Sequence, residues 1–238
     1  MNMFESKTMG ERIKGNPYVG RGIAVGMSED GSKAAIAYFI MGRSESSRNR
    51  MFLEKGDEIV IEPIDVSKVG DPSLIIYSPL RVLEGAAIVT NGDQTDTVYD
   101  FLKVGKSFSQ ALATREFEPD APNFTPRISA LLHLGDSFSY DMSILKSADE
   151  KGSACVREYF EYPALPGVGH FIHTYVTDGN PIPSFVGEPE RISIPDSAEA
   201  FLKDIWENLD EANKVAIAVR YIDLKNGTYE QTIINKYR

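Results

Sequence analysis

The 238-residue chain has a single cysteine, Cys155, and no run of 18 apolar residues. One thiol excludes an intrachain disulfide framework and any multi-thiolate zinc or iron–sulfur site. The polar start of the chain also lacks the apolar core and small-residue cleavage site of a secretory leader. We therefore expect a protein of the reducing cytoplasm with no membrane span.

Positive charge is scarce, because 25 lysines and arginines stand against 35 aspartates and glutamates, for a net charge of −10. An acidic chain repels nucleic acid and anionic membrane surfaces unless its basic residues gather in one place. We therefore expect neither nucleic acid nor membrane as a partner. The position of each arginine becomes the informative feature.

The common catalytic and metal-binding motifs are also missing. There is no P-loop, dinucleotide-binding glycine fingerprint, nucleophile elbow, HExxH or CxxC. His170 and His173 lie three residues apart in a predicted strand, so they face opposite sides and make a poor metal-binding pair. His133 and Cys155 also fall in strand patterns, where a structural role is the simpler interpretation. We expect no metal site.

Short β-rich runs dominate the sequence. Residues 22–27 and 34–41 predict a hairpin around Asp30-Gly31, and residues 214–224 and 228–234 predict another around Asn226-Gly227. Further predicted strands span residues 58–64, 74–77, 80–83, 86–90, 127–134, 138–146, 154–161 and 169–176.

Helical periodicity is confined to two regions. Residues 95–115 predict two helices separated at Gly105, and Asp196 with Glu199 has the spacing of a capping box that opens another helix. Residues 180–189 contain three prolines and predict a surface loop. Runs of strands separated by helices predict an α+β protein with two stacked, largely antiparallel sheets covered by helices. We expect a polar tail over residues 1–16 and one domain over residues 17–238.

Arginines cluster in residues 42–50, at the end of a predicted strand. Arg43, Arg48 and Arg50 lie there among small hydrogen-bonding residues, and a guanidinium binds phosphate or carboxylate through two parallel hydrogen bonds. Arg21 and Arg127, at the starts of two strands, can join the same pocket. The alternative is a solvated loop that pairs with the surplus carboxylates.

Two further segments combine polar groups. Residues 91–96, with Asn91 and Gln94, lie between a strand and a helix, where backbone amides suit an anion or a ribose, although a simple helix cap is the alternative. Residues 116–127 combine carboxylate, amide, hydroxyl and guanidinium groups that can hold a polar substrate and supply an acid or base. A rigid proline-rich connection is the competing interpretation of this loop.

Taken in order, these three segments, residues 18–26 and Tyr38 resemble the archaeal-type IMP cyclohydrolase family over roughly residues 17–190. The resemblance implies a four-layer αββα sandwich, similar to N-terminal nucleophile hydrolases but without autoprocessing. It also implies the last step of purine synthesis, in which 5-formamidoimidazole-4-carboxamide ribotide closes its ring to IMP with loss of water. The implied partner is a purine ribonucleotide, and no metal or organic cofactor is required.

The resemblance also implies roles for individual residues. The family's arginine loop maps onto Arg43 and Arg50, and its acidic loop residue onto Glu118. Ring closure needs a poor nucleophile held in place, a donor for the developing oxyanion and a proton source. We assign the oxyanion or carboxamide contact to Arg50, proton transfer to Glu118 and a second donor to Tyr38. The expected phosphate contacts are Arg43 with Arg21 or Arg127, and the expected base and ribose contacts are Asn91, Gln94, Asn123 and Thr125.

Two other functions stay open from the sequence. One is a different amide or formyl hydrolase acting on a nucleotide, and the other is a purine-nucleotide-binding protein without catalysis. The sequence also leaves the oligomeric state open, a homo-oligomer included.

Overall fold

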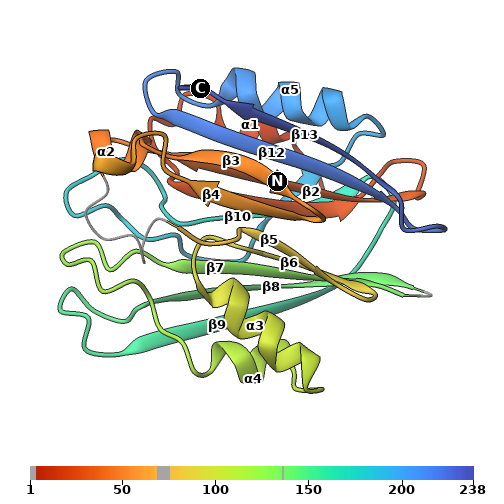
Figure 1. The fold of residues 1–238 in the computed structure, drawn as a ribbon, viewed down its shortest axis with the longest axis horizontal. Helices are drawn as coiled ribbons and strands as arrows, with labels where there is room; N and C mark the ends of the chain where they lie inside the picture. The colour runs from red at the N-terminus through yellow and green to blue at the C-terminus, as the bar shows by residue number, and fades with distance from the viewer. Residues whose placement is uncertain (1–3, 69–75, 136) are drawn as a thin grey trace.

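A computed structural model describes residues 4–68, 76–135 and 137–238. Two antiparallel sheets stack face to face, and helices cover their outer faces (Figure 1). This arrangement confirms the predicted α+β class with two antiparallel sheets. No helix in the described part of the chain is long and apolar enough to cross a membrane.

The first sheet has the strand order β11-β10-β1-β2-β12-β13. Its strands are β1 (Arg21–Met27), β2 (Lys33–Met41), β10 (Val168–His173), β11 (Glu190–Ser193), β12 (Lys214–Asp223) and β13 (Tyr229–Asn235). Two helices, α1 (Met9–Ile13) and α5 (Ala198–Asn208), contact each other, and α5 packs on β12 and β13. The predicted hairpins β1–β2 and β12–β13 are therefore neighbours of one sheet.

The second sheet has the sequential order β3-β4-β5-β6-β7-β8-β9. Its strands are β3 (Met51–Lys55), β4 (Glu58–Glu62), β5 (Leu80–Leu83), β6 (Ala86–Thr90), β7 (Arg127–Leu134), β8 (Phe138–Ser147) and β9 (Cys155–Pro163). The helix α3 (Gln94–Lys103) packs on β5 and β6 and contacts α4 (Phe108–Leu112). The short helix α2 (Glu45–Arg48) and the 3₁₀ turn η1 (Val66–Lys68) lie in connections.

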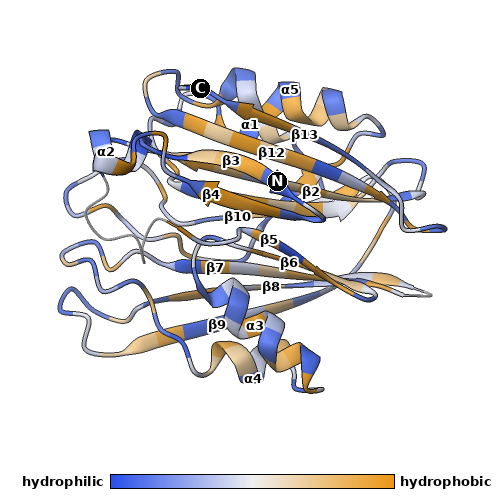
Figure 2. Ribbon diagram, in the orientation of Figure 1, coloured by the Kyte–Doolittle hydropathy of each residue, from blue (hydrophilic) through white to orange (hydrophobic). Residues whose placement is uncertain are grey.

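Alternation along β2 shows how the layers form. Ile36, Tyr38 and Ile40 belong to the core between the sheets, whereas the intervening residues of β2 pack toward α1 and α5. Both faces of β2 are covered from Ala34 to Met41, and the strand is apolar over those residues; Figure 2 shows hydrophobic colouring along strands of both sheets. This alternation directs the Tyr38 hydroxyl group into the space between the sheets.

Several local predictions are confirmed and others need correction. The break at Gly105, with φ of 74°, separates α3 from α4 as expected. However, Ser197 is the N-cap of α5 and accepts from the Ala200 N–H, whereas Asp196 accepts from the Asp30 N–H of the β1–β2 turn. Neither β3 nor α2 was predicted: α2 is a single turn inside the arginine-rich segment that was interpreted as a loop, and β3 follows that segment directly. The strand predicted for residues 74–77 lies partly outside the described residues, and residues 76 and 77 are irregular.

The predicted polar tail contains α1. Met9 and Ile13 are buried against the layer that includes α5, and the Gly10 N–H donates to Asp204 at 2.7 Å. Thr8 and Glu11 form a capping box at the start of this helix. Two apolar side chains on one face of a single turn therefore hold residues 8–13 against the sandwich, a pattern too short to stand out among polar neighbours.

Two buried histidines make the stability of the fold sensitive to acid. Burial lowers the pKa of both His170 and His173 to about 4. Below their ordinary pKa of 6.5 the unfolded chain takes up protons that the folded chain does not, so stability is present above pH 6.5 and falls from there to about pH 4. The loss is at most about 3 kcal/mol per histidine.

Urea unfolding at a series of pH values measures this effect. We expect His173→Phe, which keeps a ring against Phe171 and Phe185, to reduce the slope between pH 6.5 and 4. His133→Gln is the matched control, since hydrogen bonding to Asp141 raises the pKa of this half-exposed histidine. An unchanged slope in His173→Phe contradicts the prediction.

Candidate active site

Most of the predicted site residues meet at one end of the sandwich. Arg21 begins β1, Arg50 immediately precedes β3, and Tyr38 projects inward from β2. Glu118 and Thr125 come from the loop between α4 and β7. In Figure 1 this is the end at which α2 lies and β7 begins. Residues from both sheets and from a long loop therefore form one cluster.

Arg21 and Glu118 form the central ion pair. The Arg21 Nη2 atom lies 3.6 Å from Glu118 Oε2, and the Glu118 side chain is only 5% exposed. Burial raises the pKa of the Glu118 carboxyl, and the positive charges of Arg21, Arg127 and Arg50 oppose that rise. Such a carboxyl exchanges a proton more easily near neutral pH than an ordinary glutamate does.

Arg50 is a second buried cation in this cluster. Its side chain donates from Nε to the Ser47 carbonyl at 2.8 Å, and the residue is only 4% exposed. Within the described residues its two Nη nitrogens make no hydrogen bond or ion pair. Burial and then the neighbouring charge of Arg21 lower the pKa of Arg50. An anion placed here would relieve the repulsion between the two guanidiniums.

Four tyrosines surround the two arginines, and the site prediction included only Tyr38. The Tyr38 and Tyr77 hydroxyl groups share a hydrogen bond of 2.7 Å, and both residues interact electrostatically with Arg21 and Arg50. Burial raises the pKa of Tyr38 and of Tyr77, so both hydroxyl groups keep their protons and can donate them. The other two tyrosines, Tyr18 and Tyr175, stack with ring centroids 5.8 Å apart beside Arg21.

The loop over residues 118–125 is held in shape by its own hydrogen bonds. The Asp120 carboxylate accepts from the Thr125 backbone N–H at 2.6 Å, and the Glu118 N–H donates to the Thr125 carbonyl at 2.9 Å. Phe124 adopts a left-handed φ of 43° and packs edge-on against Phe117. The Thr125 hydroxyl group lies 2.5 Å from that of Tyr175. These contacts fix the position of Glu118.

Arg127 lies beside this cluster and is held by the start of α3. Its Nη1 atom donates to Gln94 at 2.6 Å and pairs with Asp93 at 2.7 Å. The Gln94 amide donates in turn to Asn91 and to the Ile128 carbonyl. Asn91 and Gln94 are both 0% exposed. Their amides hydrogen-bond the backbone and Arg127, and these contacts position Arg127.

We expect Asn91→Ala to destabilise the protein by about 2–4 kcal/mol, because Asn91 joins β6 to the start of β7. Its side chain accepts from the Ile128 N–H at 2.8 Å and donates to the Pro126 carbonyl at 2.8 Å. Urea unfolding measures the loss. Asp100→Ala, on the exposed face of α3, is the control and should change stability by less than about 0.5 kcal/mol.

Arg43 and Asn123 lie at the edge of the cluster. Arg43 stands over the Tyr18 ring at 5.2 Å, pairs with Asp178 and donates to the Gly179 carbonyl at 2.9 Å. Asn123 accepts from the Ile182 N–H at 3.1 Å, which ties the loop over residues 118–125 to the predicted proline-rich loop. Arg48 points elsewhere, to the Gly42 carbonyl and Asn213.

The charges in this cluster define what it can bind. Two buried guanidiniums face one buried carboxylate, with tyrosine hydroxyl groups around them. A small molecule with an anionic group, or with an oxygen that becomes anionic during reaction, complements this arrangement. In the described parts of the chain, no group of three His, Cys, Asp or Glu side chains could hold a metal ion.

The fold and the cluster together define an α+β protein with a buried, net positive cluster whose charge suits a small polar anion. The chain belongs to the IMP cyclohydrolase-like protein family, whose model matches residues 18–227. All members of the buried cluster fall within that match.

Curated relatives support the same family. The chain is 31% identical over 182 residues to the IMP cyclohydrolase of Methanopyrus kandleri, covering 71% of this chain and 89% of the relative. It is 26% identical over 162 residues to that of Methanococcus aeolicus, covering 66% of this chain and 74% of the relative. It is 28% identical over 153 residues to that of Methanococcus maripaludis strain C7, covering 60% and 75%.

Proposed function

We propose that this chain closes 5-formamidoimidazole-4-carboxamide ribotide to IMP with loss of water. The observation that carries the proposal is the buried cluster of Arg21, Arg50 and Glu118 in a chain of this family. A dehydrating ring closure needs a fixed substrate, a stabilised oxyanion and a proton relay. The cluster offers a group for each of these needs.

The chemistry begins when the carboxamide nitrogen attacks the formyl carbon. A new C–N bond forms, the nitrogen loses a proton, and the formyl oxygen becomes first an alkoxide and then a hydroxyl group. A second proton then converts this hydroxyl group into the leaving water, while the formamide nitrogen loses its own proton and a C=N double bond forms between it and the former formyl carbon. Arg50 and Tyr38 donate to the developing alkoxide, and Glu118 moves the proton from nitrogen to the leaving oxygen.

Binding of the nucleotide uses the remaining residues. Arg21 and the rim residue Arg43 are assigned to the phosphate, for which Arg43 exchanges its pairing with Asp178. Thr125 and Asn123 border the base and ribose. Asn91 and Gln94 contribute indirectly, because their hydrogen bonds hold Arg127 beside Glu118.

We further propose that the sandwich is related to N-terminal nucleophile hydrolases without autoprocessing, and that residues 17–238 form one domain. Both sheets contribute to one inner core, and helices lie outside each of them. Arg21, and not a nucleophile, stands at the start of β1. An arginine there favours binding and electrostatic stabilisation over covalent catalysis.

Purified protein incubated with the formamido ribotide tests the proposal. We expect the ultraviolet absorbance of IMP to rise faster than in a protein-free control. Release of formate without IMP would instead support hydrolysis of the formyl group by water. Saturable IMP binding by a folded protein that gives no turnover would support a binding protein, and would contradict the proposed reaction.

A further inference from the structure

Asp120 is a charged residue beside the arginine cluster to which the proposed reaction gives no role. It lies two residues after Glu118, in the loop over residues 118–125, and is partly buried. Among the described residues its carboxylate forms no ion pair, whereas Glu118 pairs with Arg21. The negative charge of Asp120 is therefore not neutralised by direct contact with a cation of the cluster.

Both oxygens of the Asp120 carboxylate bind Thr125. Oδ1 accepts from the Thr125 backbone N–H at 2.6 Å, and Oδ2 accepts from the Thr125 hydroxyl group at 2.5 Å. The Thr125 carbonyl accepts in turn from the Glu118 N–H at 2.9 Å. Thr125 is only 1% exposed. Asp120 and Glu118 are therefore fixed relative to each other through one buried residue.

The same contacts set the direction of a hydrogen-bond chain. An ionised carboxylate only accepts, and a threonine hydroxyl group has one proton to donate. Because that proton goes to Asp120, the Tyr175 hydroxyl group, 2.5 Å from that of Thr125, donates to Thr125. Only lone pairs of the Tyr175 oxygen remain for Arg21, with which Tyr175 interacts electrostatically. Two hydroxyl groups thus connect Asp120 to the cation that pairs with Glu118.

The charges around Glu118 give a second carboxylate a purpose. Three arginines, from β1, from the residue before β3 and from β7, favour the ionised form of Glu118: Arg21, Arg50 and Arg127. Burial raises the pKa of Glu118, and the charge of Asp120 adds to that rise. Tyr77 also interacts with Glu118, and burial raises the pKa of Tyr77, so its hydroxyl group stays neutral. Asp120 is therefore the negative charge that opposes the arginines at Glu118.

We propose that Asp120 is a positioning residue for the ring closure. It holds the loop of Glu118 through Thr125, and its negative charge keeps Glu118 basic enough to take the proton of the attacking nitrogen. Without Asp120 the three arginines would keep Glu118 ionised at lower pH and make it a weaker base. This role rests on the proposed function, in which Glu118 moves that proton.

Asp120→Asn separates the charge of Asp120 from the shape of the loop. Asparagine keeps one oxygen for the Thr125 N–H, and its amide group can donate to the Thr125 hydroxyl group. We expect the acidic limb of the kcat/KM pH profile, which reports ionisation of Glu118 in the free enzyme, to move at least about 0.5 pH unit lower. Thr125→Val removes the hydroxyl group and leaves the charge, so its acidic limb should stay within about 0.2 pH unit of that of the unaltered protein.

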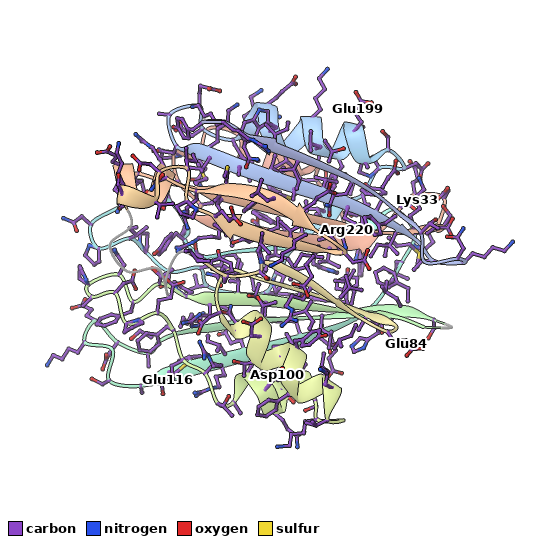
Figure 3. All side chains as sticks on the ribbon, in the orientation of Figure 1. Lys33, Glu84, Asp100, Glu116, Glu199 and Arg220 are labelled. Carbon is purple, nitrogen blue, oxygen red and sulfur yellow. The ribbon has the colours of Figure 1, made fainter. Side chains whose placement is uncertain are left out.

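Glu116→Gln is the control for loss of another carboxylate nearby. The Glu116 side chain is 67% exposed. In Figure 3 it lies at the end of the molecule opposite Lys33 and Glu84. Solvent screens an exposed charge of this kind, so we expect the acidic limb to stay in place.

NMR titration of the Glu118 carboxyl carbon, in isotope-labelled protein without substrate, needs no turnover. We expect the titration midpoint to fall in Asp120→Asn and to stay unchanged in Glu116→Gln. A midpoint that is unchanged or higher in folded Asp120→Asn would overturn the role of Asp120. A lower midpoint in a protein that closes no ring would support the effect of Asp120 on Glu118 and contradict only the proposed reaction. If Asp120→Asn fails to fold, Asp120→Ser removes the same charge, keeps an oxygen for the Thr125 N–H and decides between the same outcomes.

Discussion

Glu118→Gln is expected to lower kcat for ring closure by at least about 100-fold. Glutamine has nearly the same shape and can still form hydrogen bonds, but it cannot pass a proton from the attacking nitrogen to the leaving oxygen. Glu118 is the buried carboxyl of the cluster, and burial raises its pKa toward the range useful for proton transfer. Loss of the proton relay therefore affects the chemical step directly.

The Glu118→Gln substitution should affect substrate binding differently from catalysis. Glu118 opposes the positive charges of Arg21 and Arg50, so its neutralisation leaves the site more attractive to a phosphorylated substrate. We expect KM to stay the same or fall while kcat falls. Steady-state kinetics on folded protein separate the two effects.

Glu116→Gln is the matched control. It changes the same chemical group in the same loop, but the Glu116 side chain is 67% exposed and lies 3.9 Å from Arg157. We expect activity within about 2-fold of the unaltered protein. Near-normal kcat in Glu118→Gln would remove this residue from the proton-transfer role.

Arg50→Met is expected to lower kcat/KM for ring closure by at least about 100-fold. Arg50 carries two Nη nitrogens without partners in the described structure, next to the shared hydrogen bond of Tyr38 and Tyr77. Those nitrogens are the donors that a developing alkoxide needs. Arg50→Lys keeps the charge and loses the planar fork, so it should show an intermediate activity.

Stability should change little in Arg50→Met, because the variant removes a buried cation that Arg21 repels. Arg48→Met is the matched control. Its guanidinium binds the Gly42 carbonyl and Asn213 outside the cluster, so that variant should lose some stability and keep its activity. Activity that survives in Arg50→Met would contradict the oxyanion role.

The arginine-rich segment, residues 42–50, shows what residue type alone can and cannot predict about a site. By residue type, Arg43, Arg48 and Arg50 were equivalent, because all three lie among small polar residues, and only the family resemblance singled out Arg43 and Arg50. The turn of α2 separates them, so that Arg50 is buried beside Arg21, Arg43 lies at the rim and Arg48 faces Asn213. A loop without periodicity gives no signal for these directions.

Tyr77 and Tyr175 were missing from the predicted site for a related reason. Both lie within predicted strands, over residues 74–77 and 169–176, and a tyrosine in an apolar strand pattern cannot be distinguished from a core residue by sequence alone. Their hydroxyl groups become informative only when strands distant in sequence place them beside Arg21. The sequence also could not show where the side chains of Asn91 and Gln94 point. At the strand–helix junction both are buried, and they hydrogen-bond the backbone and Arg127.

The sequence by itself determined the α+β class, both hairpins and the break at Gly105, because alternation and turn residues act over a few neighbouring positions. It also identified Arg21, Arg50 and Glu118 as candidates, through their order along a chain that resembles a known family. Only the tertiary structure decided which charges are buried together. Burial and pairing depend on contacts between residues nearly a hundred positions apart, such as Arg21 with Glu118, and local patterns carry no information about them.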